Sequence, residues 1–147
     1  MKVGGGANHR FALFDGVLIK DSHISACGGV EAAVLAARRS VHHLQGIEVE
    51  ASNLIQVREA LAAGADAIML DNMPYEEIAD AVSVIRASGR HVTVEVSGNI
   101  TADRLPRLAG LGVDLVSMGG LIHQATWADL SMRWGDEEPP VPDQVAP

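Results

Sequence analysis

The chain has 147 residues, the length of one domain of ordinary size. Its composition, 48% hydrophobic and 20% charged, is typical of a chain that folds around a core and argues against intrinsic disorder. A formal net charge of −8 argues against the broad basic face that general nucleic-acid binding requires. Aromatic residues, at 3%, are too few to form base-stacking platforms.

The last thirteen residues differ in composition from the rest of the chain. Residues 135–147 contain four acidic residues, four prolines and no apolar periodicity, which predicts a disordered acidic tail after a domain of residues 1–134. The single cysteine, Cys27, cannot form an internal disulfide, and no apolar run has the length of a signal-peptide core or a membrane span. The sequence therefore predicts a cytoplasmic protein that does not enter a membrane.

Short apolar runs alternate with longer helical patterns, an order that predicts a parallel sheet built from right-handed strand–helix–strand units. The helical segments carry one-sided apolar stripes, such as Ile78, Val82 and Ile85. Gly64 and Gly112 follow two such stripes, where a left-handed C-cap is favoured. The five predicted strands are residues 17–20, 46–50, 67–71, 92–96 and 114–118.

The strand ends recur every 21 to 30 residues, the length of one β/α unit. Because a complete eight-unit barrel takes about 250 residues, we predict an α/β fold that is a partial (β/α) barrel of about five parallel units. Lys2 and Val3 resemble the end of an earlier strand, and Trp127 and Trp134, seven residues apart, predict a final helix. The first and last strands would lack a neighbour, so we expect exposed edges and a homo-oligomer, a dimer or larger.

Each predicted strand ends in residues that do not belong in a core. In parallel α/β folds the carboxyl ends of the strands form the ligand-binding face, so these residues are predicted to converge on one pocket. Side chains alternate along a strand, which places Glu48 and Glu50 together on the inner face. The alternative, ordinary loop charges, accounts for one such end more readily than for five in succession. In chain order these residues are Lys20 with Asp21, Glu48 with Glu50, Asp71 with Asn72, Glu95 with the Ser97, Gly98 and Asn99 turn, and the Gly119 and Gly120 pair.

A glycine run, Gly4 to Gly6, precedes Asn8, His9 and Arg10. Its backbone N–H groups beside two cationic side chains can cradle an anion, although a flexible terminus is an equally good interpretation. The run matches neither the P-loop spacing nor the dinucleotide-binding spacing. The lone cysteine and the scattered histidines show no zinc-ligand spacing.

Six motifs in unbroken order resemble the quinolinate phosphoribosyltransferases, the carboxylating nicotinate-nucleotide pyrophosphorylases of NAD biosynthesis. The resemblance runs from Gly4 to about Trp134 and covers only the C-terminal half of a family member. It implies that the family's N-terminal sandwich domain and first barrel strands have no counterpart among these 147 residues. Small departures are Ser22, where the family often has Asn, and Gly120, Ile122 and Gln124 near the end. The motifs are GGGANHR at residues 4–10, LIKDSHI at 18–24, EVE at 48–50, GAD leading to MLDNM at 64–73, EVSGNI at 95–100 and GVD leading to SMG at 112–119.

The resemblance implies a reaction in which phosphoribosyl pyrophosphate and quinolinate, with Mg²⁺, give nicotinate mononucleotide, carbon dioxide and pyrophosphate. It further implies catalytic roles for Lys20, Glu50 and Asp71, with Glu50 and Asp71 also binding ribose hydroxyls or Mg²⁺. His9, Arg10 and Lys20 are the candidate cations for the two carboxylates of quinolinate. The remaining substrate-binding residues, which would hold the 5′-phosphate and adjoining groups, are Ser97, Gly98, Asn99, Gly119 and Gly120.

Three alternatives stay open at the level of sequence. The chain could be a non-catalytic remnant that keeps half of an active site. It could be a related pyrophosphorylase-like protein associated with molybdenum transport, which shares these motifs. A third alternative is a different α/β-barrel enzyme, such as a lyase that forms a Schiff base at Lys20.

Overall fold

The computed structural model describes residues 2–132 and 134–135, and its centre is one parallel sheet. The order of the strands in the sheet is their order in the chain, and each neighbouring pair is parallel. The α/β class and the five parallel strands predicted from the sequence are thus confirmed. The strands are β1 (Val17–Ile19), β2 (Ile47–Ala51), β3 (Ala67–Asp71), β4 (Thr93–Ser97) and β5 (Leu115–Val116).

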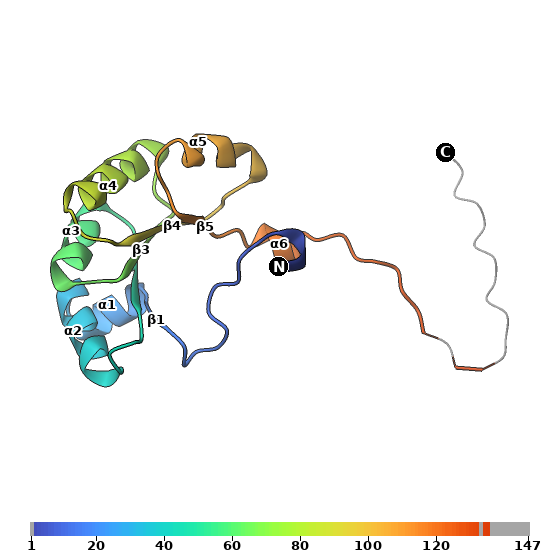
Figure 1. Cartoon of the computed structure of the whole chain (residues 1–147), viewed down its shortest axis with the longest axis horizontal. Helices are drawn as coiled ribbons and strands as arrows, with labels where there is room; N and C mark the ends of the chain where they lie inside the picture. The colour runs from blue at the N-terminus through green and yellow to red at the C-terminus, as the bar shows by residue number, and fades with distance from the viewer. Residues whose placement is uncertain (1, 133, 136–147) are drawn as a thin grey trace.

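The helices that connect the strands form an arc along one side of the sheet (Figure 1), while the N-terminal segment and α6 lie on the other side. A sheet whose strands follow chain order, joined by crossovers of one hand, collects its helices on a single face. This is the winding of a barrel, not of a doubly wound sheet. The helices are α1 (Asp21–Cys27), α2 (Val30–Ser40), α3 (Leu54–Ala63), α4 (Tyr75–Ala87), α5 (Leu105–Ala109) and α6 (Gly120–His123), with short 3₁₀ turns η1 (Lys2–Gly4) and η2 (Ala102–Arg104).

The core lies between the sheet and the helices, and side-chain alternation decides what enters it. On β2, Ile47 and Val49 are fully buried against the helices, whereas Glu48 and Glu50 point to the opposite, inner face and stay partly exposed. The same alternation buries Ile68 and Leu70 of β3 and Val94 and Val96 of β4 on the helix side. The prediction that the two glutamates share the inner face is therefore confirmed.

The ends of the elements differ from the predictions by about one residue. β1 stops at Ile19 because Lys20 is the N-cap of α1, which begins at Asp21. β2 and β4 are each displaced by one residue toward the C-terminus. The last strand has two residues in place of the five predicted over 114–118, which fits its position at the edge of the sheet, where it pairs only with β4.

Two predictions are wrong. Lys2 and Val3 belong to η1, not to a strand, because no neighbouring strand lies beside them in the described part and a local bond from Gly5 N–H to the Lys2 carbonyl (3.0 Å) forms instead. Within residues 125–132 and 134–135 the structure has no final helix around Trp127 and Trp134. Their exposures of 95% and 103% show that these rings pack against nothing within the described residues.

The predicted tail of residues 135–147 lies, from residue 136 onward, outside the described residues. The longest helix in the described part, α4, has 13 residues, and none there has both the length and the hydropathy needed to cross a bilayer.

A repeated clamp fixes the amino ends of the strands. Asp66, just before β3, accepts hydrogen bonds through Oδ2 from Arg38 of α2 (2.8 Å) and from the backbone N–H of Ile47 (2.8 Å). Asp114, just before β5, accepts in the same way from Arg86 of α4 (2.8 Å) and from the N–H of Val94 (2.7 Å). Each aspartate thus ties a helix to the start of the neighbouring strand, which explains the Gly-x-Asp motif that precedes both β3 and β5.

We expect Asp114→Ala to lower the free energy of unfolding at pH 7 by about 1–2 kcal/mol, because the N–H of the buried Val94 loses its acceptor. The exposed ion pair with Arg86 adds little. Urea unfolding of the variant and of Asp80→Ala, an exposed α4 position without a hydrogen bond in the described part, measures the difference. Equal stability of the two variants contradicts the clamp.

The cost of Asp114→Ala should also depend on pH. Burial raises the pKa of Asp114, but the hydrogen bonds from Arg86 and Val94 outweigh it and hold the pKa below its ordinary value. A lowered pKa means that the contribution is complete above the ordinary aspartate value and is lost as the pH falls through the lowered one. The difference between wild type and variant should therefore shrink in acid.

Candidate functional site at the carboxyl ends of the strands

Lys20 and Glu50 meet at the carboxyl ends of β1 and β2. The Lys20 ammonium nitrogen lies 3.4 Å from Glu50 Oε2, with the lysine side chain half exposed and the glutamate mostly covered. The local sequence fixes Lys20, because its backbone N–H donates to Nδ1 of His23 (2.9 Å) in the first turn of α1. The predicted convergence of these two residues is what the structure shows.

Asp71 is the last residue of β3, beside this pair on the inner face. Glu50 is in register with Met69, two residues before Asp71, and Asp71 is in register with Ser97 of β4. No hydrogen bond or ion pair in the described part joins Asp71 to Lys20 or Glu50. Its carboxylate instead accepts a hydrogen bond from Nδ2 of Asn72 (2.9 Å). The three predicted catalytic residues therefore lie at or next to the carboxyl ends of three neighbouring strands, with Asp71 placed between the ion pair and β4.

The ends of β4 and β5 enclose a hollow of about 350 Å³. Within the described residues, the backbone N–H groups of Gly98, Gly119 and Gly120 donate no hydrogen bond, so they are available to an anion. The structure thus brings together the four residues predicted to hold the 5′-phosphate, Ser97, Gly98, Gly119 and Gly120, with Asn99, another predicted substrate-binding residue. The hollow is lined by Ser97, Gly98, Asn99, Ile100, Thr101, Ser117, Gly119, Gly120, His123 and Gln124.

The glycines of this hollow leave space that side chains from the next turn occupy. A Cβ on Gly119 would lie 3.0 Å from Nε2 of His123, and a Cβ on Gly120 would lie 2.9 Å from Oε1 of Gln124. His123 was not among the predicted site residues. Its spacing of four residues from Gly119, one turn of a helix, is the signal that could have identified it.

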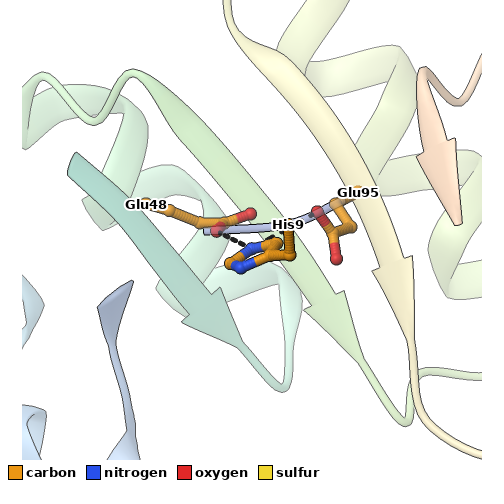
Figure 2. A group of neighbouring side chains, drawn as sticks. All are labelled: His9, Glu48 and Glu95. Atoms are coloured by element: carbon orange, nitrogen blue, oxygen red, sulfur yellow. Dashed lines mark hydrogen bonds and ion pairs between the residues drawn. The ribbon is translucent and has the colours of Figure 1, made fainter. Parts of the chain in front are cut away.

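His9 crosses the inner face of the sheet and lies between two glutamates (Figure 2). Its Nε2 atom is 2.8 Å from Oε2 of Glu48 on β2 and 3.8 Å from Oε2 of Glu95 on β4. Glu95, only 2% exposed, also accepts a hydrogen bond from the Ser117 hydroxyl. The three potential ligand atoms lie within 4.8 Å of one another, a spacing that could also hold a divalent cation.

The sequence singles out Glu95 as a charged residue that does not belong in the core of β4, but it predicts no catalytic or binding role for it. Glu95 lies close enough to Glu48 to change the pKa of Glu48. Burial raises the pKa of Glu48, the negative charge of Glu95 raises it further, and the hydrogen bond with His9 opposes both. The net direction is upward, so the carboxylate form of Glu48 carries an electrostatic cost in the folded chain.

Arg10 lies at the other end of the strands. Its guanidinium donates to the carbonyl of Gly16 (3.3 Å), and it lines a second hollow of about 350 Å³ with residues that precede β1, β2 and β3 and the first residue of β4, Thr93. The structure therefore does not bring Arg10 together with Lys20, Glu50 and Asp71. His9 lies between the two ends, beside Glu48.

Comparison with known proteins identifies the family to which this arrangement belongs. Residues 1–133 match the family model described as quinolinate phosphoribosyl transferase, C-terminal domain. The chain belongs to the quinolinate phosphoribosyltransferase family. The six motifs thus indicated the correct family, and its C-terminal barrel portion accounts for the five parallel β/α units.

Individual relatives agree with this assignment. The chain is 44% identical over 132 residues to a probable nicotinate-nucleotide pyrophosphorylase [carboxylating] of Bacillus subtilis, covering 90% of this chain and 45% of the relative. It is 43% identical over 141 residues to the Homo sapiens nicotinate-nucleotide pyrophosphorylase [carboxylating], covering 95% and 48%. The crystal structure of NadC from Streptococcus pyogenes superimposes with a TM-score of 0.79 at 44% identity, covering 90% and 46%. The chain thus spans about half the length of the relatives it matches.

We expect Glu48→Gln to stabilise the chain at pH 7 and to have little effect at pH 4. Because the pKa of Glu48 is raised, the folded state holds its proton more tightly than the unfolded state, and stability falls as the pH rises above the ordinary glutamate value of 4.5. Glutamine removes that charge and keeps an acceptor for His9. Thermal unfolding at both pH values, beside Glu59→Gln on the exposed face of α3 as control, measures the effect. A destabilised variant at pH 7 would show that the ion pair with His9 dominates.

Proposed function

We propose that this chain provides the phosphate- and ribose-binding face of an enzyme that transfers phosphoribosyl from phosphoribosyl pyrophosphate to quinolinate. The products would be nicotinate mononucleotide, carbon dioxide and pyrophosphate. The observation that carries the proposal is the order of groups along one rim: the Lys20–Glu50 pair, then Asp71, then the glycine-lined hollow between β4 and β5. This order suits a phosphoribosyl substrate. The glycine-lined hollow would take the 5′-phosphate, the two carboxylates would face the ribose, and the cation would lie toward the leaving group.

The hollow at β4 and β5 would hold the 5′-phosphate. The N–H groups of Gly98, Gly119 and Gly120 and the hydroxyl of Ser97 are neutral donors that can surround phosphate oxygens. Barrel enzymes commonly bind a phosphate at the ends of their last two strands. This assignment supports substrate-binding roles for the two glycine turns in the family reaction.

Glu50 and Asp71 would act on the ribose. Loss of pyrophosphate leaves positive charge on the sugar, and carboxylates placed beside it stabilise that charge while accepting hydrogen bonds from ribose hydroxyls. Lys20, 3.4 Å from Glu50, would hold that carboxylate in place and present its remaining N–H bonds to an anionic group. No side-chain nucleophile is needed, because the ring nitrogen of quinolinate would itself bond to the anomeric carbon as pyrophosphate leaves. When carbon dioxide then leaves, the electron pair of the broken bond would stay on the ring carbon, stabilised by the adjacent positive nitrogen, until a proton replaces the lost group.

The residues at this rim fit Mg²⁺, which we propose as the cofactor. Glu50 and Asp71 offer only oxygen atoms, the ligands that Mg²⁺ prefers, and Asp71 Oδ1 makes no hydrogen bond in the described part of the chain. When bound, Mg²⁺ would neutralise the charge of the leaving pyrophosphate. Glu50 and Asp71 would hold the ion.

Quinolinate binding is the least complete part of the site within this chain. Of the proposed cations, Lys20 lies at the rim, His9 is paired with Glu48, and Arg10 lies at the opposite end of the strands. A dianion beside Glu48, Glu50 and Asp71 therefore needs further cations, which we propose come from the half of its relatives that this chain does not span. Self-association through the free edges of β1 and β5 and a cytoplasmic location stay predictions.

The proposal is tested by assaying nicotinate mononucleotide formation by the 147-residue chain with Mg²⁺, quinolinate and phosphoribosyl pyrophosphate. We expect little activity alone, because misplacing a substrate by about 1 Å can cost about 10²-fold in rate. Adding the separately expressed N-terminal segment of a full-length relative should restore it. Absence of activity in the supplemented sample would favour a non-catalytic remnant, and full activity without the supplement would show that the cations are already present.

In the supplemented assay we expect Glu50→Ala and Asp71→Ala each to lower kcat by about 10² to 10³. Both side chains lie on the inner face, so the core residues of β2 and β3 are untouched and the thermal midpoints should stay near wild type. Glu59→Ala on α3 is the matched control and should keep wild-type kcat. A variant at the rim that keeps its kcat does not belong to the site.

A further inference from the structure

Two asparagines connect the phosphate hollow to Asp71. Nδ2 of Asn99, in the turn after β4, donates to Oδ1 of Asn72, in the turn after β3, at 3.0 Å. Nδ2 of Asn72 then donates to Oδ2 of Asp71 at 2.9 Å. The two amides are thus aligned in one direction, donor to acceptor, from the β4 turn to the carboxylate. Asn72 is the one side chain in the described part that hydrogen-bonds Asp71.

Both asparagines have a backbone conformation that is unfavourable for residues other than glycine. Asn72 and Asn99 are the non-glycine residues with positive φ in the described chain, at 53° and 51°. Asparagine tolerates this region better than most residues, but glycine occupies it more easily still. The backbone conformation of these turns would favour glycine. The presence of asparagine is therefore explained by the hydrogen bonds that its side chain makes.

Gly98 lets the turn after β4 approach Asn72 closely. Its φ is 91°, and a Cβ built on it would lie 2.4 Å from Oδ1 and 2.8 Å from the backbone nitrogen of Asn72. The N–H of Asn72 also donates to the carbonyl of Ser97 (3.1 Å), and Arg104 donates to the carbonyl of Asn99 (3.2 Å). The turn after β4 therefore packs directly on the Asn72 amide and is hydrogen-bonded to the turn after β3.

We propose that Asn72 and Asn99 are positioning residues that orient the Asp71 carboxylate and couple it to the phosphate hollow. An anion that orders the Ser97, Gly98 and Asn99 turn would fix the Asn99 amide, then the Asn72 amide, and through it Oδ2 of Asp71. Oδ1 of Asp71 would stay free for the ribose or for Mg²⁺. The inference rests on the proposed function for the identity of the ligand. The relay, meaning the hydrogen bonds from Asn99 to Asn72 and from Asn72 to Asp71, does not depend on that identity.

The relay is tested first without a ligand, by ¹⁵N NMR of the side-chain amides in the full chain. We expect the Asn72 Nδ2 resonance to move in both Asp71→Ala and Asn99→Gly. The first change removes the acceptor of Nδ2, and the second removes the donor to Oδ1 of the same amide. The side-chain amide of Asn53, at the N-cap of α3, is the internal reference and should not move. An Asn72 resonance that responds to neither substitution overturns the relay.

The coupling is then measured by calorimetric titration of phosphoribosyl pyrophosphate in Mg²⁺ with Asn72→Gly, Asn99→Gly and the double variant. Glycine keeps the positive φ, so the thermal midpoint should not fall, while each single variant should bind about 10-fold more weakly. Because both act through Asp71, the double variant should lose no more than Asn72→Gly alone. Asn72→Asp keeps the size and the acceptor but loses the donor, and it should bind no better than Asn72→Gly.

The outcomes separate the two proposals. Failure of the wild-type chain to bind phosphoribosyl pyrophosphate contradicts the proposed function, and the NMR measurement still decides whether the relay exists. Wild-type affinity in Asn72→Gly, or losses that add in the double variant, would falsify the coupling while leaving the substrate assignment intact.

Discussion

The arrangement of this molecule depends on one constraint: five parallel strands in chain order, with the helices α1 to α5 on a single face. The apolar side chains of each strand then point to the helices. Because side chains alternate along a strand, every second side chain points away from the helices to the inner face. The glutamates 48, 50 and 95 occupy such positions. Because the strands are parallel, their carboxyl ends also share one rim, and residues far apart in the sequence become neighbours there without a long loop.

The hydrogen bonds that tie helices to strands lie at the amino ends of the sheet, and the candidate functional residues lie at the carboxyl ends. At the amino ends, Asp66 and Asp114 each satisfy a backbone N–H of the adjoining strand and an arginine from the helix layer. At the carboxyl ends, the turns carry glycines, asparagines and single charged residues, and the backbone N–H groups of Gly98, Gly119 and Gly120 donate no hydrogen bond within the described residues. The polar groups of this rim are exposed or partly exposed, so water can satisfy them, and leaving them available to a ligand carries little of the cost of burying a polar group without a partner.

Much of this could be read from the sequence because it is periodic. The five strands, the inner position of Glu48 and Glu50, and the convergence of Lys20 with Glu50 follow from alternation and strand polarity. The placement of His9 and Arg10 could not be read, because a glycine-rich segment has no period that fixes where it crosses the sheet. Glu95 is predicted only as a charge that does not belong in an apolar strand, and His123 is not predicted. Their contacts with Ser117, on another element, and with Gly119, one helical turn away, are visible only once the chain is packed.

The most direct test of the assigned face is a residue-resolved titration of the ¹⁵N-labelled chain with phosphoribosyl pyrophosphate and Mg²⁺. Binding at the rim predicts backbone amide shifts concentrated at Gly98, Asn99, Gly119 and Gly120, with a smaller response at Asn72, and none at the amino-end hollow beside Arg10 and Thr93. The two hollows have the same volume, about 350 Å³, so size alone does not favour either. Shifts centred on Gly16, Gly46 and Thr93 would contradict the assignment and would place the ligand at the opposite end of the strands.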